Sequence, residues 1–200
     1  MAEDFCPYEE KREQIFQAAV AEFQEKGFRD ASMNRVSERA GASKRTVYKH
    51  FESKEKLFQE LVRRHWARFA SSLEVSYQSD RDIREQLTDL GHAQGQLFTS
   101  PDVMAMTKLV MSEVLRSPEL VEENQEKTDY KVYFQAMLQD AVRDGQIVTD
   151  DPNGAADEFI SLLKGKAFWP VVLGAPVVSK SEMNKIVEDS VAMIMSRYGV

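Results

Sequence analysis

Apolar residues recur along this chain at the three- and four-residue spacing of amphipathic helices, without sustained two-residue alternation. This pattern predicts an all-α protein. A first helix is expected over residues 8–26, stopped by Gly27, where a residue that tolerates a positive φ ends a helix at little cost. A long helix is expected to start after Ser53, its N-cap, and to reach about Leu73.

Two short helices are expected between these, over residues 33–40 and 44–51. Ser32 and Ser43 stand at their N-cap positions, where a hydroxyl accepts a hydrogen bond from a free backbone N–H. Gly41 provides the turn between them. A helix, a short glycine turn and a second helix form the helix-turn-helix pattern, whose second helix enters the major groove of DNA.

The predicted second helix carries the side chains that this placement needs. Lys44 and Arg45 are long donors at its N-terminal end, able to reach guanine O6 and N7. Short or rigid donors suited to phosphate oxygens are Ser32, Thr46, Tyr48 and His50. Lys54 begins the next helix, where free N–H groups already favour an anion, so it is also expected to bind phosphate.

The charge distribution supports this assignment. The whole chain is −7, but residues 43–56 carry five Lys or Arg against two acids, a balance of +3. Residues 1–66 balance at +1 and residues 67–200 at −8, so the acids lie mainly away from the motif. A short basic helix alone is more often a solvated surface. Its combination with a capped partner helix and the Gly41 turn favours DNA binding.

Residues 12–62 resemble the N-terminal domain of TetR-family transcriptional regulators. The resemblance rests on Phe23, Gly27-Phe28, Val36-Ser37, Ala40-Gly41-Ala42-Ser43, Thr46-Val47-Tyr48, His50-Phe51 and Lys54-Glu55-Lys56-Leu57-Phe58. It implies phosphate contacts by Tyr48, His50 and Lys54. It also implies base reading by Lys44, Arg45 and Lys49, with Asn34 and Arg35 as helpers from the preceding helix. Lys49 departs from the aromatic or small residue often found there, which leaves the operator sequence open. Residues 113–120 resemble the AefR-like subgroup.

Five further helices are expected near residues 81–99, 101–116, 119–144, 153–173 and 180–198. Proline at positions 101 and 118 fits a helix start, and Gly145 and Gly174 fit helix ends. About nine helices result. They form a three-helix DNA-binding head over residues 8–54 and an effector-binding and dimerisation bundle over residues 55–200.

Two groups of apolar residues in the predicted bundle of residues 55–200 are candidates for a function. The candidate effector pocket comprises Phe98, Met104, Met106, Met111, Phe134 and Met137. For each of these residues an ordinary core position is the alternative, and the pocket itself is implied by the family resemblance. The candidate dimer interface comprises Phe159, Leu163, Phe168, Ile186, Val191 and Ile194, because the last two helices carry more apolar positions than one buried stripe needs. A two-fold dimer would set two recognition helices about 34–36 Å apart.

Other functional classes lack support in the sequence. His50, His65 and His92 are widely separated, without a partner at metal-ligand spacing, and no nucleophile or phosphate-loop motif is present. We therefore expect no enzyme activity, no metal and no cofactor. The lone Cys6, the acidic N-terminus and an apolar run of only twelve residues (167–178) predict a cytoplasmic protein with no membrane partner.

The sequence thus predicts a homodimeric, ligand-responsive transcriptional regulator. The expected mode is a repressor released from a palindromic operator when a small apolar molecule binds the C-terminal bundle. The alternative from another class is a small-molecule carrier bundle without a DNA role, which would show no salt-dependent binding to a duplex. Activation in place of repression stays open.

Overall fold

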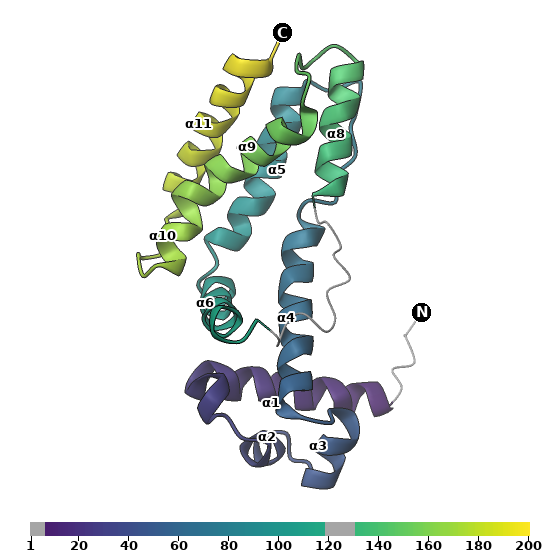
Figure 1. Ribbon diagram of the computed structural model, residues 1–200, viewed down its shortest axis with the longest axis vertical. Coiled ribbons are helices and arrows are strands. Elements are labelled where there is room, and N and C mark those ends of the chain that lie inside the picture. Colours follow the sequence, from purple (N-terminus) through teal and green to yellow (C-terminus); the bar gives the residue numbers. More distant parts are fainter. Residues whose placement is uncertain (1–6, 119–130) are drawn as a thin grey trace. The chain divides into compact units, whose positions relative to one another are not determined.

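The computed structural model describes residues 7–118 and 131–200, which contain ten helices and no strand beyond an isolated bridge between Ile147 and Gly199 (Figure 1). The helices are α1 (Pro7–Asp30), α2 (Met33–Arg39), α3 (Lys44–His50), α4 (Lys54–Ser71), α5 (Ile83–Phe98), α6 (Pro101–Arg116), α8 (Val132–Arg143), α9 (Pro152–Ala167), α10 (Trp169–Val172) and α11 (Lys180–Tyr198). The all-α prediction is confirmed.

The helix expected over residues 153–173 is the main difference from the predicted pattern. It is divided into α9 and α10 at Phe168. Pro170 explains the break, because its ring has no N–H for a helical hydrogen bond and would clash with the carbonyl of Lys166 one turn earlier. The helix predicted over residues 119–144 is represented by α8, and residues 119–130 lie outside the described part.

The chain divides into two compact units. Of the described residues, 7–65 and 105–118 belong to the first unit, and 66–104 and 131–200 belong to the second. Helices α4 and α6 each contribute residues to both units. The boundary predicted between residues 54 and 55 therefore does not coincide with the division by contacts.

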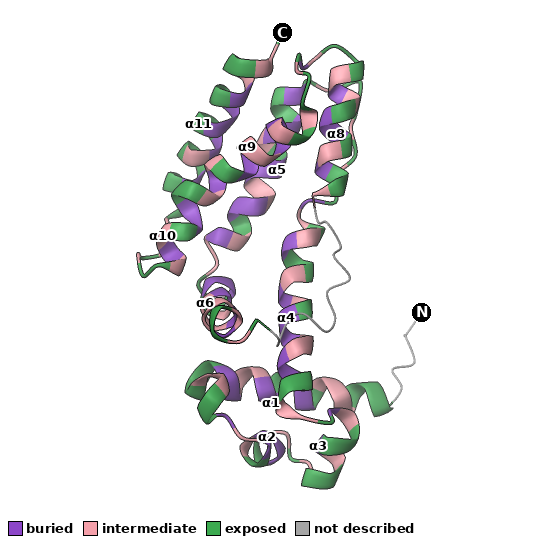
Figure 2. Ribbon diagram, viewed as in Figure 1, coloured by how far each residue is buried: buried purple, intermediate pink, exposed green. Residues whose placement is uncertain are grey.

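The core of the second unit is formed mainly by α5, α9 and α11, which pack against one another, with α8 on α9. Figure 2 shows buried positions running along these helices. Close approach of α5 and α11 depends on Gly91, since a Cβ there would lie 2.7 Å from Cγ1 of Val187. At one end of this core the ring of Phe98 contacts that of Phe168, with centroids 5.5 Å apart.

The packing corrects the predicted dimer interface. Phe159, Leu163, Phe168, Val191 and Ile194 are all buried inside the protomer, and Ile186 is half-buried. The reason is that α9 and α11 bury their most apolar stripes against each other and against α5. These five side chains are core residues and cannot supply an exposed apolar face.

None of the helices within residues 7–118 and 131–200 is long and apolar enough to cross a membrane. Over the same residues, no three side chains of the metal-binding types gather where they could hold an ion.

In the first unit, α1 and α4 share an aromatic core. The rings of Phe23 and Phe58 meet edge to face with centroids 5.5 Å apart, and Phe28 lies 4.7 Å from Phe58. Beside this core the Glu60 carboxylate accepts hydrogen bonds of 2.8 Å from Arg63 and Arg64. Arg64 also pairs with Glu13 of α1, so the charged cluster joins the two helices.

The Glu60 cluster predicts a loss of stability in acid. Hydrogen bonds from Arg63 lower the pKa of Glu60 from 4.5 to about 2, against the opposing effect of burial. Because the folded-state pKa is depressed, this stabilisation is present above pH 4.5 and is lost as the pH falls toward 2. Glu60→Gln should lower the free energy of unfolding at neutral pH by about 1 kcal/mol, after allowance for solvent screening. Urea denaturation across this pH range measures the free energy of unfolding. If that free energy depended on pH in the same way in Glu60→Gln and in the parent, the stabilising role of Glu60 would be contradicted.

Candidate nucleic-acid interface

The helix-turn-helix is built by two serine caps and one glycine. The Ser32 hydroxyl accepts a hydrogen bond from the N–H of Arg35 at 3.3 Å, and the Ser43 hydroxyl accepts one from Thr46 at 3.1 Å. Gly41 has a φ of 52°, in the left-handed region that side chains with a Cβ rarely adopt. The predicted caps and turn are therefore confirmed.

Burial orients the recognition helix α3. Val47 is fully buried and fixes the inner face of this short helix, while Lys44, Arg45 and Lys49 are exposed. Within the described residues these three cations make no hydrogen bond or ion pair. Tyr48 is also exposed, by 49%. One surface of α3 thus presents three unpaired positive charges and a phenol, the donors that DNA bases and phosphates accept.

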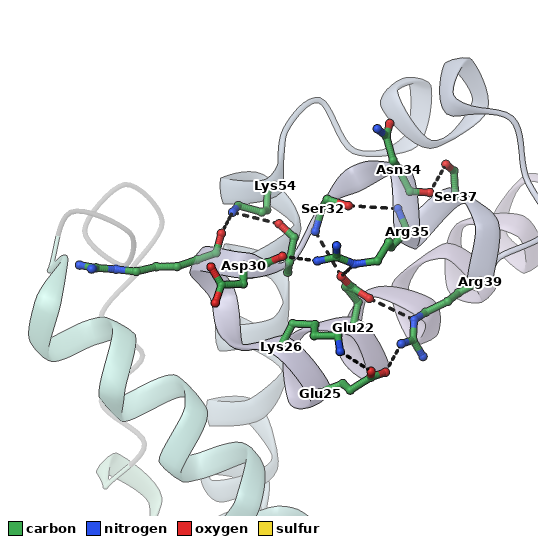
Figure 3. A network of polar contacts seen from close by, with 12 residues as sticks. Glu22, Glu25, Lys26, Asp30, Ser32, Asn34, Arg35, Ser37, Arg39 and Lys54 are labelled. Carbon is green, nitrogen blue, oxygen red and sulfur yellow. Dashed lines mark hydrogen bonds and ion pairs between the residues drawn. The ribbon is translucent and has the colours of Figure 1, made fainter.

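The two predicted helpers on α2 have different environments (Figure 3). Asn34 is exposed and its side chain points away from the polar network. Arg35 is held inside the head, with its Nε 2.5 Å from the fully buried carboxylate of Glu22 and a further hydrogen bond to the carbonyl oxygen of Asp30. These bonds use two of the five N–H donors of the guanidinium, so base reading by Arg35 would have to use the others.

Lys54 is likewise occupied. Its ammonium donates to the carbonyl oxygens of Phe28, Arg29 and Ala31 at 2.8, 3.0 and 3.2 Å, and it lies 4.6 Å from the centre of the Phe28 ring. A lysine has three N–H donors, so these bonds use all of them. The predicted phosphate contact would need at least one to be broken.

The remaining predicted phosphate contacts stay near the surface of the motif. The Thr46 hydroxyl lies 2.8 Å from that of Ser43, and Ser32 caps α2. His50 stacks on Tyr8, with ring centroids 4.3 Å apart. Its Nδ1 is buried and has no hydrogen-bond partner among residues 7–118 and 131–200. Burial, with the nearby charges of Lys49 and Arg12, lowers the pKa of His50 below 6.5, so its ring is mainly neutral at pH 7.

Two residues that the sequence interpretation did not single out also shape this surface. Glu22 has no exposed surface and pairs with Arg39 at 3.1 Å in addition to Arg35. Lys11 donates to the carbonyl oxygen of Ala40 at 3.0 Å, at the end of α2. The available signal was the position of Glu22 among apolar residues of α1, since a carboxylate at a core position requires partners.

The predicted effector-pocket residues have different environments within their own units. A cavity of about 360 Å³ in the second unit is lined by Glu74, Val75, Ser76, Gln78, Arg81, Gln86, Asp89, Leu90, Ala93 and Met137. Met137 is the predicted residue that lines it. Phe98, Met104 and Phe134 are instead buried in the core of the second unit, and Met106 and Met111 are half-buried positions of α6 in the first. For Phe98, Met104 and Phe134 the burial in the core agrees with ordinary packing, the alternative that the sequence left open.

A helix-turn-helix with an exposed basic recognition helix, on an otherwise all-α chain, defines a DNA-binding transcriptional regulator. Comparisons with known proteins agree. Residues 15–61 match the model for bacterial regulatory proteins of the tetR family, and residues 85–200 match the C-terminal domain of AefR-like transcriptional repressors. The chain therefore belongs to the TetR family, as its sequence motifs predicted.

Individual relatives have the same character. The chain is 32% identical over 146 residues, 70% of each protein, to the HTH-type transcriptional regulator UidR of Escherichia coli (strain K12). It is 33% identical over 81 residues to the HTH-type transcriptional activator FasR of Mycolicibacterium smegmatis, covering 40% of this chain and 37% of that one. Among solved structures, a TetR family transcriptional regulator from Pseudomonas syringae pv. tomato has a TM-score of 0.80 and 36% identity, covering 96% of this chain and 98% of that chain.

The environment of His50 predicts that DNA binding depends on pH. A phosphate contact would favour the protonated ring and raise its pKa in the complex above the depressed value of the free protein. Binding would then take up a proton between these two pKa values, so affinity should increase as the pH falls through the pKa of the complex toward that of the free protein. Fluorescence anisotropy with a labelled duplex measures this dependence. In His50→Gln this pH dependence of DNA affinity should be absent. A pH profile equal to that of the parent protein would exclude a phosphate contact by His50.

Proposed function

We propose that this regulator acts as a homodimeric repressor, which leaves a palindromic operator when a small molecule binds its C-terminal region. The observation that carries the DNA-reading part is the α3 surface. Lys44, Arg45 and Lys49 are exposed and unpaired within the described residues, above a fully buried Val47 that fixes their direction. The match to AefR-like repressors supports repression in preference to activation.

Base reading is assigned to Lys44, Arg45 and Lys49, with Asn34 as the helper from α2. Phosphate contacts are assigned to Ser32, Thr46, Tyr48 and His50. Arg45 lies in the first turn of α3, where its guanidinium can donate two parallel hydrogen bonds to O6 and N7 of guanine. Its long, flexible side chain has no internal partner to lose in the described structure, so binding costs it mainly rotamer entropy.

The effector is assigned to the cavity that Met137 and Leu90 share with Arg81 and Gln86. A volume of about 360 Å³ lies within the range of small-molecule sites. The lining combines an apolar side with carboxylate, amide and guanidinium groups. It therefore favours a compact molecule with both apolar and polar parts over the wholly apolar ligand expected from the sequence.

A dimer surface is assigned to the outward stripes of α9 and α11. Ion pairs set the register of these stripes: Lys166 lies 3.8 Å from Asp189, and Glu158 lies 3.6 Å from Arg197. On α9 the half-buried Leu162 lies one turn from both Glu158 and Lys166. On α11 the exposed Met193 lies one turn from both Asp189 and Arg197. Beyond Leu162 the same face of the chain continues to Gly165, where a Cβ would meet no atom within 4 Å, and to Trp169, which is 45% exposed. An open glycine between apolar side chains allows close approach of a partner helix.

The first test is Arg45→Ala. The variant should bind the operator about 1–3 kcal/mol more weakly and lose preference at one base position, because the guanine contact is removed. Selection of bound duplexes from random DNA, followed by titration of the selected operator, measures both effects. Arg84→Ala removes an exposed arginine of α5 and should change neither. Undiminished sequence preference in Arg45→Ala would show that Arg45 does not read a base.

The second test concerns the dimer. Met193→Glu should shift the protein toward monomers, because it places a charge in the centre of the assigned apolar surface. Sedimentation equilibrium measures this shift. Operator binding should weaken at the same time, because a monomer carries one DNA-binding head and cannot bind both half-sites. Val132→Glu adds the same charge at an apolar residue of α8 that is 52% exposed, comparable with 54% for Met193, and serves as the control. If Met193→Glu associated as tightly as the control, the outward stripes of α9 and α11 would not be the dimer surface.

A further inference from the structure

The first turns of α1 lie beside the recognition helix α3 and contact the chain at both of its ends (Figure 1). Lys11 donates to the carbonyl oxygen of Ala40 at 3.0 Å, in the turn that leads into α3. The guanidinium of Arg12 lies 4.7 Å from the centre of the Phe51 ring, directly after α3. Tyr8 is one helical turn before these two cations, so their contacts also fix its place against α3.

Tyr8 meets His50 at the C-terminal end of α3. The two ring centroids are 4.3 Å apart with 33° between the ring planes, so the tyrosine covers one face of the imidazole. Tyr8 is 44% exposed and makes no hydrogen bond among the described residues. Its side chain therefore acts through this ring contact.

The two nitrogens of the His50 ring have different surroundings. Nδ1 is turned inward, where it is buried without a hydrogen-bond partner among the described residues. The side chain as a whole is half-buried, so the ring keeps an accessible edge. A phosphate oxygen can reach the imidazole only from that edge, which leaves Nε2 as the nitrogen that donates to DNA.

We infer that Tyr8 is a positioning residue of the DNA interface, whose ring holds the imidazole of His50 in the plane that presents Nε2 to a phosphate. This inference rests on the proposed function, in which His50 contacts DNA. The χ2 torsion of histidine is broad, so an isolated ring turns easily about it. A ring that is already held by a stacked partner loses less freedom on binding, and affinity increases accordingly.

The charges around His50 act on the same ring. Three cations and one acid affect its titration, Lys49 from α3 and Lys11, Arg12 and Glu9 from α1. Burial is the largest cause that lowers the pKa of His50 below 6.5, and the cations lower it further. Since Tyr8 covers one face of the imidazole, it contributes to that burial. The pKa of His50 in the free protein therefore reports whether the stack is present.

The first readout is this pKa. Tyr8→Ala should raise the pKa of His50 toward 6.5, because the imidazole gains contact with water. Proton NMR titration of the free protein measures it, and His50→Gln identifies the His50 signal among the three histidines. Tyr8→Phe keeps a stacked ring and should restore the parent pKa. Tyr133→Ala removes a tyrosine of α8 that is 53% exposed and serves as the matched control. An equal pKa of His50 in Tyr8→Ala and the parent would overturn the inference.

Operator affinity is the second readout. Tyr8→Ala should weaken operator binding about threefold to tenfold, the range of one aromatic pair, and Tyr8→Phe should restore it. In a His50→Gln background the same replacement should have little further effect, because the residue that Tyr8 positions is absent. Equal weakening by Tyr8→Ala with and without His50 would overturn the positioning role, since Tyr8 would then act on DNA by another route. Unchanged affinity in Tyr8→Ala would overturn it as well.

Both readouts require folded protein, which urea denaturation checks for each variant. If Tyr8→Ala does not fold, Tyr8→Leu takes its place, because leucine keeps an apolar side chain on α1 without an aromatic face. The same results are then expected. A parent protein that binds no duplex would refute the proposed function. In that case the pKa of His50 in the free protein would still decide whether Tyr8 covers and holds the imidazole.

Discussion

The charge of Glu22 has to be balanced inside the head, and this requirement organises the DNA-binding part of the structure. The carboxylate has no exposed surface, and its two side-chain partners both come from α2. Since desolvating a carboxylate is costly unless it is paired and hydrogen-bonded, α2 is held at the one place where Arg35 and Arg39 can reach it. The helix-turn-helix then follows from this placement, because the Gly41 turn leads directly from α2 into α3.

Cations serve two separate purposes in this head. One group stabilises the negative ends of helices and the buried acid: Lys54 and Arg35 bind the carbonyls after Gly27, and Lys11 binds the carbonyl of Ala40. The other group, on α3, faces outward without internal partners in the described residues. A count of positive charges near the motif therefore does not distinguish cations that bind carbonyls and carboxylates inside the head from those that face outward.

The second unit shows a similar division between burial and exposure. The strongly apolar stripes of α9 and α11 are used within the protomer, where Phe159, Leu163 and Val191 join the core. What remains outside is a narrower surface of mixed character around Leu162, Met193 and Trp169, crossed by ion pairs. A partner on this face would meet fewer apolar side chains than the sequence suggested, with charged pairs at defined positions to set its register.

Local signals in the sequence determined the helices, the serine caps, the left-handed turn at Gly41 and the family, because each depends on residues close together in the chain. Pro170 is a helix breaker that can be read from the sequence. The helical spacing of the apolar residues continues past it, however, and so a single helix was predicted over residues 153–173. Only the tertiary structure decided which of several equivalent residues did which task. Arg35 and Arg45 are both arginines near the start of short helices, and Phe134 and Met137 lie on one turn of α8. Their roles differ because a buried carboxylate, a row of free carbonyls or a cavity lies beside one and not the other, and those neighbours come from distant parts of the chain.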